Sequence, residues 1–288
     1  MFRKLLFSSL IFFSACAVTA QNTDSLALVK AKWNKQKIAP KIKLIRFHFK
    51  EKELFKANEN ISYLEIKNKG KSSRLIIGAE DTLLKPVSIF GDKANALAAV
   101  NGSFFDVKNG GAVDFIKKDG RVLANNRLLK DSVRAIHQRA AIAITNGRLQ
   151  IEKWDGSDNW EQKITAENVM VSGPLLIYNG MDELISLTDS FNTVRHPRTC
   201  IGIKNNGKLI ILTVDGRNSN AEGMSLPELT KIMRWLGCKA AINLDGGGST
   251  TLWVKDFPNN GVINYPSDNK KWDHEGERNV ANVILLQK

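Results

Sequence analysis

The chain has 288 residues, of which 43% are hydrophobic, and it carries 42 lysines and arginines against 29 aspartates and glutamates, for a formal net charge of +13. This length is enough to bury a large core, either as one elaborate domain or as a small arm followed by a main domain. After residue 20 no stretch is long and apolar enough to cross a bilayer as a helix, so the sequence predicts no transmembrane segment.

The first 20 residues have the pattern of a secretory signal. Arg3 and Lys4 precede the apolar run 5–13, and small residues close the segment at Val18-Thr19-Ala20. Cleavage after Ala20 predicts a secreted or periplasmic protein, and the alternative is an envelope lipoprotein attached through Cys16.

A basic protein outside the cytosol has different natural partners from a basic cytosolic one. Nucleic acid becomes a weak inference, and we expect none as a partner; phosphorylated or acidic glycans and anionic envelope surfaces are favoured instead. The alternative is a solvated basic surface without a specific partner, which describes Lys30 to Lys56 well.

Residues 21–60 read as an amino-terminal arm, and residues 61–288 as the main domain. The arm is predicted to begin with a short helix around residues 24–35 and to contain a strand at 42–49. Strands at 61–66 and 74–78 follow.

A short helix at 88–96 is expected to lead into strand 97–100, which ends in Asn101-Gly102-Ser103. The amide, glycine and hydroxyl at this strand end suit one wall of a pocket, although Asn-Gly also forms simple turns.

The middle of the chain is predicted to be rich in β-hairpins. Their turns fall at Asp119-Gly120, Asn146-Gly147 and Asn206-Gly207, dipeptides that favour tight hairpin turns. Ser172-Gly173-Pro174 interrupts a strand over residues 170–178 and can turn backbone or a hydroxyl toward a cavity. This pattern predicts a β-rich middle of the chain, built from mixed sheets, with the few helices flanking it.

Two strand ends carry the most informative carboxylates. Strand 210–214 delivers Asp215-Gly216-Arg217, a capped helix occupies residues 225–236, and strand 240–242 then leads to Asp245. This order reads as a βαβ unit, in which both carboxylates leave the sheet on the same side.

The stretch from Asn243 to Thr251 combines one carboxylate, three glycines and three hydroxyls. Gly246, Gly247 and Gly248 let a ligand approach the backbone closely, which suits an anion or a sugar hydroxyl. The alternative is a tight turn without a ligand. No lysine follows the glycines as in nucleotide-binding phosphate loops, so the stretch does not predict nucleotide binding.

Arg195-His196-Pro197-Arg198-Thr199 is a candidate anion clamp, because guanidinium groups match the oxygens of phosphate or carboxylate. A solvated basic loop is the competing interpretation.

Asp215 and Asp245 suit work on a glycosidic bond, whose anomeric carbon becomes positive in the transition state. A phosphate leaving group needs less acid assistance and more positive charge around it, which Arg198, Arg217 and His196 can supply. Asp215 can instead be a carboxylate that caps a turn.

Six motifs, in their order along the chain, resemble the phosphodiester glycosidase family over roughly residue 61 to the end. They are 101–105 (NGSFF), 172–176 (SGPLL), 196–199 (HPRT), 215–217 (DGR) with the helix after it, 243–250 (NLDGGGST) and 277–282 (ERNVAN).

The resemblance implies an α+β domain that hydrolyses the bond between a sugar's anomeric carbon and a phosphodiester, in a sugar-phosphate or phosphoglycan substrate. It implies Asp245 and Asp215 as catalytic residues. The implied substrate-binding residues are Asn101, Ser103, Ser172, His196, Arg198, Thr199, Arg217, Asn243, Gly246, Gly247, Gly248, Ser249, Thr250 and Arg278. Ser103 stands where a glycine is common, and Cys200 where a small residue is usual, so the width of the pocket is expected to differ.

Several alternatives stay open at this point. A noncatalytic phosphoglycan binder is the main rival to a glycosidase. No cofactor is expected; a divalent cation between Asp215 and Asp245 is an open alternative, because two carboxylates without a third ligand do not define a metal site. Cys200 and Cys238 suit either one disulfide or two buried thiols. The sequence does not predict an oligomeric state.

Overall fold

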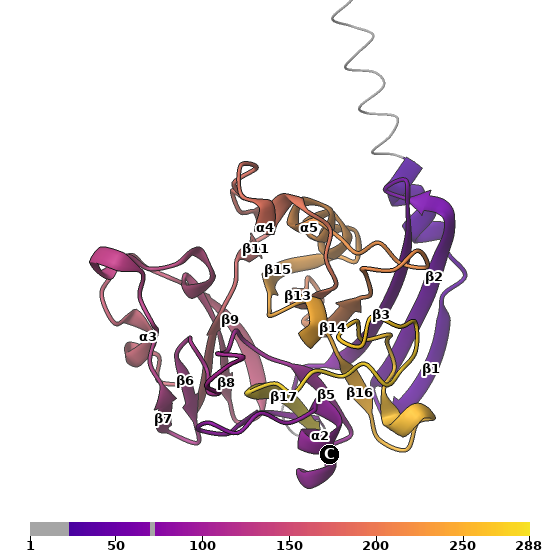
Figure 1. The fold of residues 1–288 in the computed structure, drawn as a ribbon. Helices are drawn as coiled ribbons and strands as arrows, with labels where there is room; N and C mark the ends of the chain where they lie inside the picture. The colour runs from indigo at the N-terminus through magenta and orange to yellow at the C-terminus, as the bar shows by residue number, and fades with distance from the viewer. Residues whose placement is uncertain (1–22, 70–72) are drawn as a thin grey trace, which may run out of the picture.

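The computed structural model describes residues 23–69 and 73–288 (Figure 1). The predicted signal segment, including Cys16 and Ala20, lies outside the described residues, as does part of the turn between the strands predicted at 61–66 and 74–78. Among the helices of the described ranges, none is both long and apolar enough to span a membrane.

The strands of the described ranges form three antiparallel-paired sheets. The largest has eight strands, listed here from edge to edge: β1 (Asn34–Ala39), β2 (Ile42–Leu54), β3 (Ala57–Lys67), β14 (Lys208–Val214), β13 (Arg198–Lys204), β15 (Cys238–Asn243), β11 (Leu175–Tyr178) and β12 (Met181–Asp182).

The second sheet has five strands and the third has four. In spatial order the second contains β7 (Arg121–Ala124), β6 (Ile116–Lys118), β10 (Asn168–Ser172), β8 (Ala140–Thr145) and β9 (Arg148–Lys153). The third contains β16 (Leu252–Val254), β5 (Ala98–Asn101), β17 (Asn282–Gln287) and β4 (Arg74–Ala79).

Helices are few and short. They are residues 23–30, α2 (Val87–Lys93), α3 (Trp160–Lys163), α4 (Ser190–Thr193) and α5 (Leu226–Trp235), together with 3₁₀ turns at Lys130–Ser132, Ile136–Gln138, Gly247–Ser249 and Asn259–Gly261. The predicted α+β class is confirmed.

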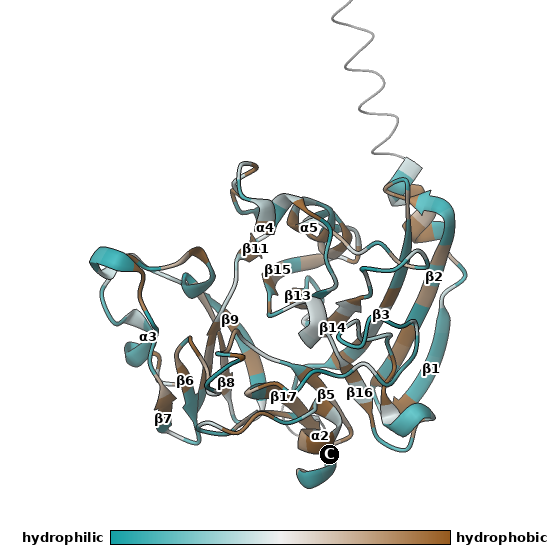
Figure 2. Cartoon of the chain, viewed as in Figure 1, coloured by the Kyte–Doolittle hydropathy of each residue, from teal (hydrophilic) through white to brown (hydrophobic). Residues whose placement is uncertain are grey.

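One hydrophobic core joins the three sheets. Leu64 of the eight-stranded sheet, Ile142 of the five-stranded sheet and Ile284 of the four-stranded sheet belong to the same buried cluster. Figure 2 shows that hydrophobic residues gather on the inner strands and on α2, whereas β1 and many surface loops are hydrophilic. A second buried cluster fills the space between the eight-stranded sheet and α5.

The predicted hairpins are confirmed, and their turns show why the sequence was informative. Asp119 and Gly120 have φ of +50° and +80°, and Asn146 and Gly147 have +51° and +73°, which is the left-handed backbone of a two-residue hairpin turn. The turn before β14 uses Gly207 at φ +77°.

The capped helix at α5 is confirmed as well. Ser225 accepts a hydrogen bond from the amide of Glu228, whose carboxylate accepts one from the amide of Ser225 at 2.9 Å. Gly237, at φ +85°, ends the helix as predicted.

The amino-terminal helix is shorter than expected. It ends at residue 30, and Asn34 and Lys35, predicted to be helical, begin strand β1. Pairing of β1 with β2, with Lys35 opposite Ile45, overrides the weak local helix preference. The residues read as an arm thus supply β1, β2 and the first four residues of β3, at one side of the eight-stranded sheet.

Ser172-Gly173-Pro174 marks a change of sheet. Strand β10 ends at Ser172 in the five-stranded sheet, and β11 begins at Leu175 in the eight-stranded sheet. The interruption that the sequence predicted in one strand is therefore a crossing between two layers.

The predicted βαβ unit is present with one difference. Strands β14 and β15 both pair antiparallel with β13, so they run parallel to each other, with β13 between them. Their carboxyl ends still reach the same edge of the sheet, and Asp215 and Asp245 both lie at that edge, as predicted.

Helix α5 touches the sheet at Gly202 of β13. A Cβ at Gly202 would stand 2.4 Å from Met233 Cε and 2.7 Å from Cys238 Sγ. We expect Gly202→Ala to lower the free energy of unfolding by about 1–3 kcal/mol, because the side chains of Met233 and Cys238 must shift from their packed positions. Chemical denaturation measures this. In a Met233→Ala background the same substitution should cost less, and an equal cost in both backgrounds would contradict this packing.

Candidate active site

The glycine turn is held by two other motifs. The amide of Asp245 donates to the carbonyl oxygen of Gly102 at 3.0 Å, and the amide of Gly247 donates to that of Pro197 at 2.8 Å. Three segments far apart in the sequence therefore meet at one place.

The side chain of Asn101 joins these segments. Its Nδ2 donates to the carbonyl oxygen of Asp245 at 2.7 Å, and its Oδ1 accepts from Thr199 Oγ1 at 2.7 Å and from the Thr251 amide at 3.1 Å. Asn101 and Thr199 are fully buried. Asn101 and Thr199, both predicted to bind substrate, therefore stabilise the glycine turn from its buried side.

Asp245 is a half-buried carboxylate whose pKa lies well above its usual range. Its Oδ1 accepts from the Gly246 amide at 2.9 Å. Burial raises the pKa of Asp245 to about 6, and the negative charge of Asp114 acts in the same direction. The Ser249 hydroxyl, the Gly246 amide and the charge of Arg278 lower this pKa. A carboxyl that titrates near neutral pH is suited to proton transfer or nucleophilic attack.

Two guanidinium groups lie against the glycines. A Cβ on Gly247 would stand 2.8 Å from Arg217 Nη2, and a Cβ on Gly248 would stand 2.5 Å from Arg278 Nη2. Arg278 donates to Asp268 through Nε at 2.9 Å, whereas Arg217 is exposed and its guanidinium has no ion pair or hydrogen bond to residues 23–69 or 73–288. The bare backbone is required here, because any side chain would displace a cation.

The candidate anion clamp divides into separate parts. Arg198 is buried, donates through Nε to the Met224 carbonyl at 2.8 Å and through Nη2 to the Phe191 carbonyl at 2.7 Å, and its cation lies 5.0 Å from the Phe191 ring. Burial and the charge of Arg217 lower the pKa of Arg198 to about 10. Arg195 is bound to Glu222 and Glu228.

His196 is half-buried beside these cations. Burial and the charges of Arg198 and Arg217 lower its pKa, which favours the neutral imidazole. A neutral imidazole can accept a hydrogen bond from a ligand hydroxyl or donate one to an anion.

Asp215 is enclosed by hydrogen-bond donors. Its carboxylate accepts from Asn60 Nδ2 at 2.7 Å, from Asn264 Nδ2 at 2.9 Å and from the Tyr265 amide at 2.9 Å. Burial raises the pKa of Asp215, and these donors oppose the increase.

Asp114 is the carboxylate that the sequence did not single out. It is fully buried, with Ser103 Oγ at 3.0 Å, Gln138 Nε2 at 3.0 Å and His137 Nε2 at 3.3 Å. No strand-end pattern precedes Asp114, and its partners come from other segments, so sequence alone gave no signal for it. Ser103, which stands where a glycine is common in the family's motif, donates one of these hydrogen bonds to Asp114 through its hydroxyl.

His137 is the second residue that sequence reasoning left aside. Its ring lies 4.7 Å from Phe104, and its backbone lies against Gly173, where an added Cβ would stand 3.0 Å from His137 Cα. It therefore joins the motif around Gly173 to Asp114.

Buried polar atoms without partners gather at the glycine turn. Asn243 donates through Nδ2 to the carbonyl oxygens of Gly173 at 3.0 Å and Leu244 at 2.7 Å, and Ser172 Oγ lies 3.3 Å from the Asn243 carbonyl oxygen. Among the described residues, no hydrogen-bond partner is found for Asn243 Oδ1, Thr250 Oγ1 or Thr251 Oγ1. Such a concentration is unusual in a buried turn and favours a ligand or ordered water there.

The described residues contain no group of three or more His, Cys, Asp or Glu side chains placed to hold a metal ion. Cys200 and Cys238 are free buried thiols, so the disulfide alternative is not adopted.

Fold and site together define an α+β protein that seats a carboxylate and two arginines on a glycine-rich strand end. The chain belongs to the phosphodiester glycosidase family, whose model matches residues 94–287. This match confirms the resemblance inferred from the motifs. The family consists of hydrolases that act on glycosyl bonds.

Known relatives agree with this assignment. The mouse N-acetylglucosamine-1-phosphodiester alpha-N-acetylglucosaminidase is 27% identical over 182 residues, which cover 61% of this chain and 34% of the mouse protein. The chain thus spans about a third of the length of the mammalian relatives it matches.

Solved structures share the fold. The catalytic domain of the zebrafish N-acetylglucosamine-1-phosphodiester alpha-N-acetylglucosaminidase, auto-inhibited by its pro-peptide, has a TM-score of 0.66 at 22% identity and covers 94% of this chain and 92% of that chain. A hypothetical protein from Synechocystis has a TM-score of 0.63 at 15% identity, covering 88% and 63%.

The Asn101 side chain gives a test of how the turn is held. Asn101→Ala leaves the Asp245 carbonyl, the Thr199 hydroxyl and the Thr251 amide without their partner, and we expect a loss of about 3 kcal/mol or more in the free energy of unfolding. Asn205→Ala, at an exposed position in the β13–β14 turn, should change it by less than about 0.5 kcal/mol. Equal denaturation midpoints for the two variants would contradict the role of Asn101.

Proposed function

We propose that this protein is a glycosidase that hydrolyses the bond between a sugar's anomeric carbon and a phosphodiester, with Asp245 as the reacting carboxylate. The main support for this proposal is the position of Asp245. It is half-buried on a glycine turn, and the guanidinium groups of Arg217 and Arg278 lie against Gly247 and Gly248 of that turn. Few other functions need a titrating carboxylate next to two cations on bare backbone.

The arrangement suits each part of the substrate. The phosphate group binds against Arg217 and Arg278, where guanidinium and backbone N–H groups offset the charge that develops on the leaving phosphate oxygen. Ionised Asp245 faces the anomeric carbon as it becomes positive. The bond from the anomeric carbon to the phosphate oxygen breaks, and its electron pair leaves with the phosphate. Water adds its oxygen and one proton to the anomeric carbon as a hydroxyl, and its other proton passes to the released phosphate or to solvent.

The two other carboxylates have supporting roles in this proposal. Asp114 raises the proton affinity of Asp245 and orients His137 at 3.3 Å. Asp215, surrounded by three donors, anchors the segment around Asn264, which in turn donates to the Thr250 carbonyl at 2.9 Å. Asp215 is thus a positioning residue in this proposal, although the sequence predicted it as a catalytic one.

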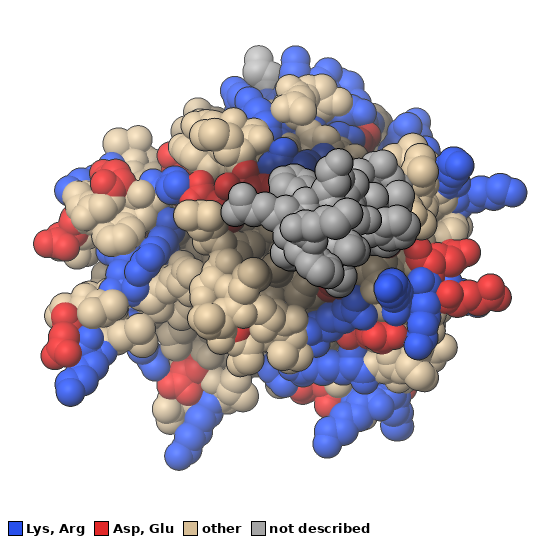
Figure 3. Space-filling view, turned by 90° about the horizontal axis from the view of Figure 1, so that it is seen from above, with Lys and Arg blue, Asp and Glu red and all other residues tan. Residues whose placement is uncertain are grey.

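The substrate we favour is a phosphoglycan or envelope polysaccharide met outside the cytosol. The signal-like pattern of residues 1–20 and the net charge of +13 support this class. Figure 3 shows basic side chains around the rim of one face with acidic ones among them, which suits weak attraction of an anionic polymer more than a continuous nucleic-acid groove.

Asp245→Asn tests the reacting group. The substitution removes the ionisable carboxyl but keeps its size, so kcat/KM on a panel of sugar-1-phosphodiesters, followed by release of reducing sugar, should fall by about 10³-fold or more. Asp158→Asn, at an exposed position, is the matched control and should keep full activity. An active Asp245→Asn enzyme would exclude the assignment; saturable binding of diesters without any turnover in the natural protein would identify a noncatalytic binder instead.

The pH profile tests the ionisation state that the reaction needs. The pKa of Asp245 is raised to about 6, so its reactive carboxylate is present above that value and is lost as the pH falls through it. We expect kcat/KM to decline about tenfold per pH unit below about 6. Rates that rise on acidification through this range would instead make Asp245 a proton donor.

A further inference from the structure

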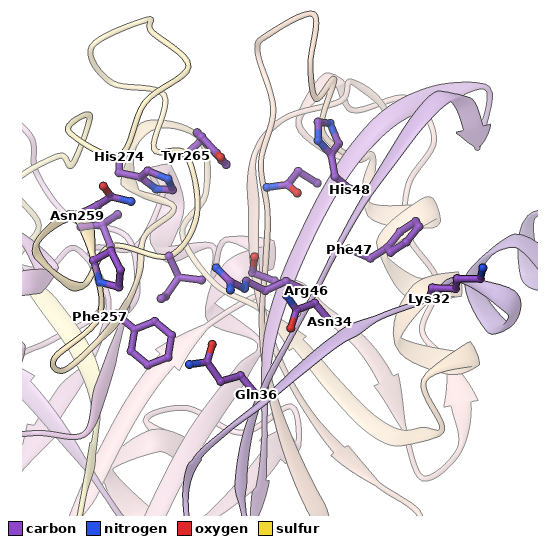
Figure 4. Close-up of a pocket in the computed structure, with 15 residues that line it drawn as sticks. Lys32, Asn34, Gln36, Arg46, Phe47, His48, Phe257, Asn259, Tyr265 and His274 are labelled. Atoms are coloured by element: carbon purple, nitrogen blue, oxygen red, sulfur yellow. The ribbon is translucent and has the colours of Figure 1, made fainter.

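A second cavity lies beside Asp215, away from the glycine turn. Its volume is about 550 Å³, within the range of roughly 300–1,000 Å³ that is usual for small-molecule sites. Strands β1–β3 form one wall, and the segment 257–265 with His274 forms the other (Figure 4).

The lining is cationic and rich in amides. Asn34, Gln36 and Asn60 bring amide groups, Arg46 brings a guanidinium, and none of the described Asp or Glu residues lines the cavity. Figure 4 places Arg46 between the two walls. Its guanidinium makes no ion pair or hydrogen bond with the described residues, unlike Arg195, Arg234 and Arg278, each of which is paired with a carboxylate. An unpaired guanidinium among amides suits a ligand that carries both negative charge and hydroxyls.

Aromatic rings form a rigid part of the wall. The Tyr265 ring stacks on Trp272 with centroids 4.1 Å apart and planes 2° apart, and His274 lies 4.3 Å from Tyr265. These contacts fix the positions of the Tyr265 and His274 rings, which line the cavity.

The two imidazoles of the lining are fixed by backbone carbonyls. His48 Nε2 lies 2.7 Å from the Asn220 carbonyl oxygen, and His274 Nδ1 lies 2.7 Å from the Asn264 carbonyl oxygen. A ring that donates to its carbonyl oxygen through that nitrogen has its other nitrogen free to bond a ligand.

We propose that this cavity binds a phosphorylated saccharide unit, with its hydroxyls on the amides and imidazoles and its phosphate on Arg46. Asn60 and Tyr265, which line the cavity, also hold Asp215 at 2.7 and 2.9 Å, so the cavity and the glycine turn share one support. The inference that the cavity holds the part of the substrate beyond the cleaved bond rests on the proposed function. The inference that it binds a phosphorylated saccharide does not.

Calorimetric titration of the folded protein with glucose 6-phosphate, glucose and inorganic phosphate tests the binding site. We expect glucose 6-phosphate to bind at least tenfold more tightly than either glucose or phosphate, and Arg46→Gln to weaken it at least tenfold. Lys43→Gln, an exposed charge on the same strand, and Arg217→Gln, at the glycine turn, should each change its affinity less than twofold.

Thermal melting of Arg46→Gln should match that of the natural protein, so that a lost affinity reports on the cavity. Glucose 6-phosphate that binds Arg46→Gln normally, or that loses affinity in Arg217→Gln instead, would overturn the site.

Kinetics separate this inference from the proposed function. With a phosphodiester whose leaving group is a phosphorylated saccharide, Arg46→Gln should lower kcat/KM at least tenfold, while a methyl phosphodiester of the same sugar should be hydrolysed as before. Equal effects on both diesters would overturn the substrate-chain role. If no diester is hydrolysed but glucose 6-phosphate binding still depends on Arg46, the proposed function fails and the binding site stands.

Discussion

The arrangement of this protein depends on one buried amide. Asn101 holds the carbonyl of Asp245, the hydroxyl of Thr199 and the amide of Thr251 at the same time, and thereby ties strand ends from two sheets to one turn. A buried polar group that satisfies three partners is costly to replace, since each lost partner becomes an unpaired group away from water. The glycine turn can stay open toward a ligand because its reverse side is fixed in this way.

The positive charges at the glycine turn depend on its backbone as well. Backbone without side chains lets Arg217 and Arg278 approach Gly247 and Gly248, and the positive charge of Arg278 offsets part of the cost of burying Asp245. Arg198 lies deeper and is satisfied by carbonyl oxygens, so it shapes the loop that carries Phe191. Arginines that meet at one place in the fold therefore have different roles: Arg198 stabilises the wall, whereas Arg217 lies where a ligand can reach it.

Local chemistry determined what could be predicted from the sequence. The Asn146-Gly147 turn and the capped helix α5 depend on neighbouring residues, so they were predicted correctly. Asp114 could not be, because its setting is built by Ser103 and His137 from other segments. Similarly, the donors around Asp215 come from residues 155 and 49 positions away, Asn60 and Asn264, and only the folded chain reveals how completely they enclose it.

The strand between β14 and β15 has a consequence for how the two regions are related. Neighbouring strands lie about 4.8 Å apart, so β13 sets the strands that end at Asp215 and Asp245 about 10 Å from each other. The Asp215 end meets the cavity and the Asp245 end meets the glycine turn. Substitutions on β1 and β2 can therefore change which ligand the cavity prefers. The residues of the glycine turn stay unchanged when they do.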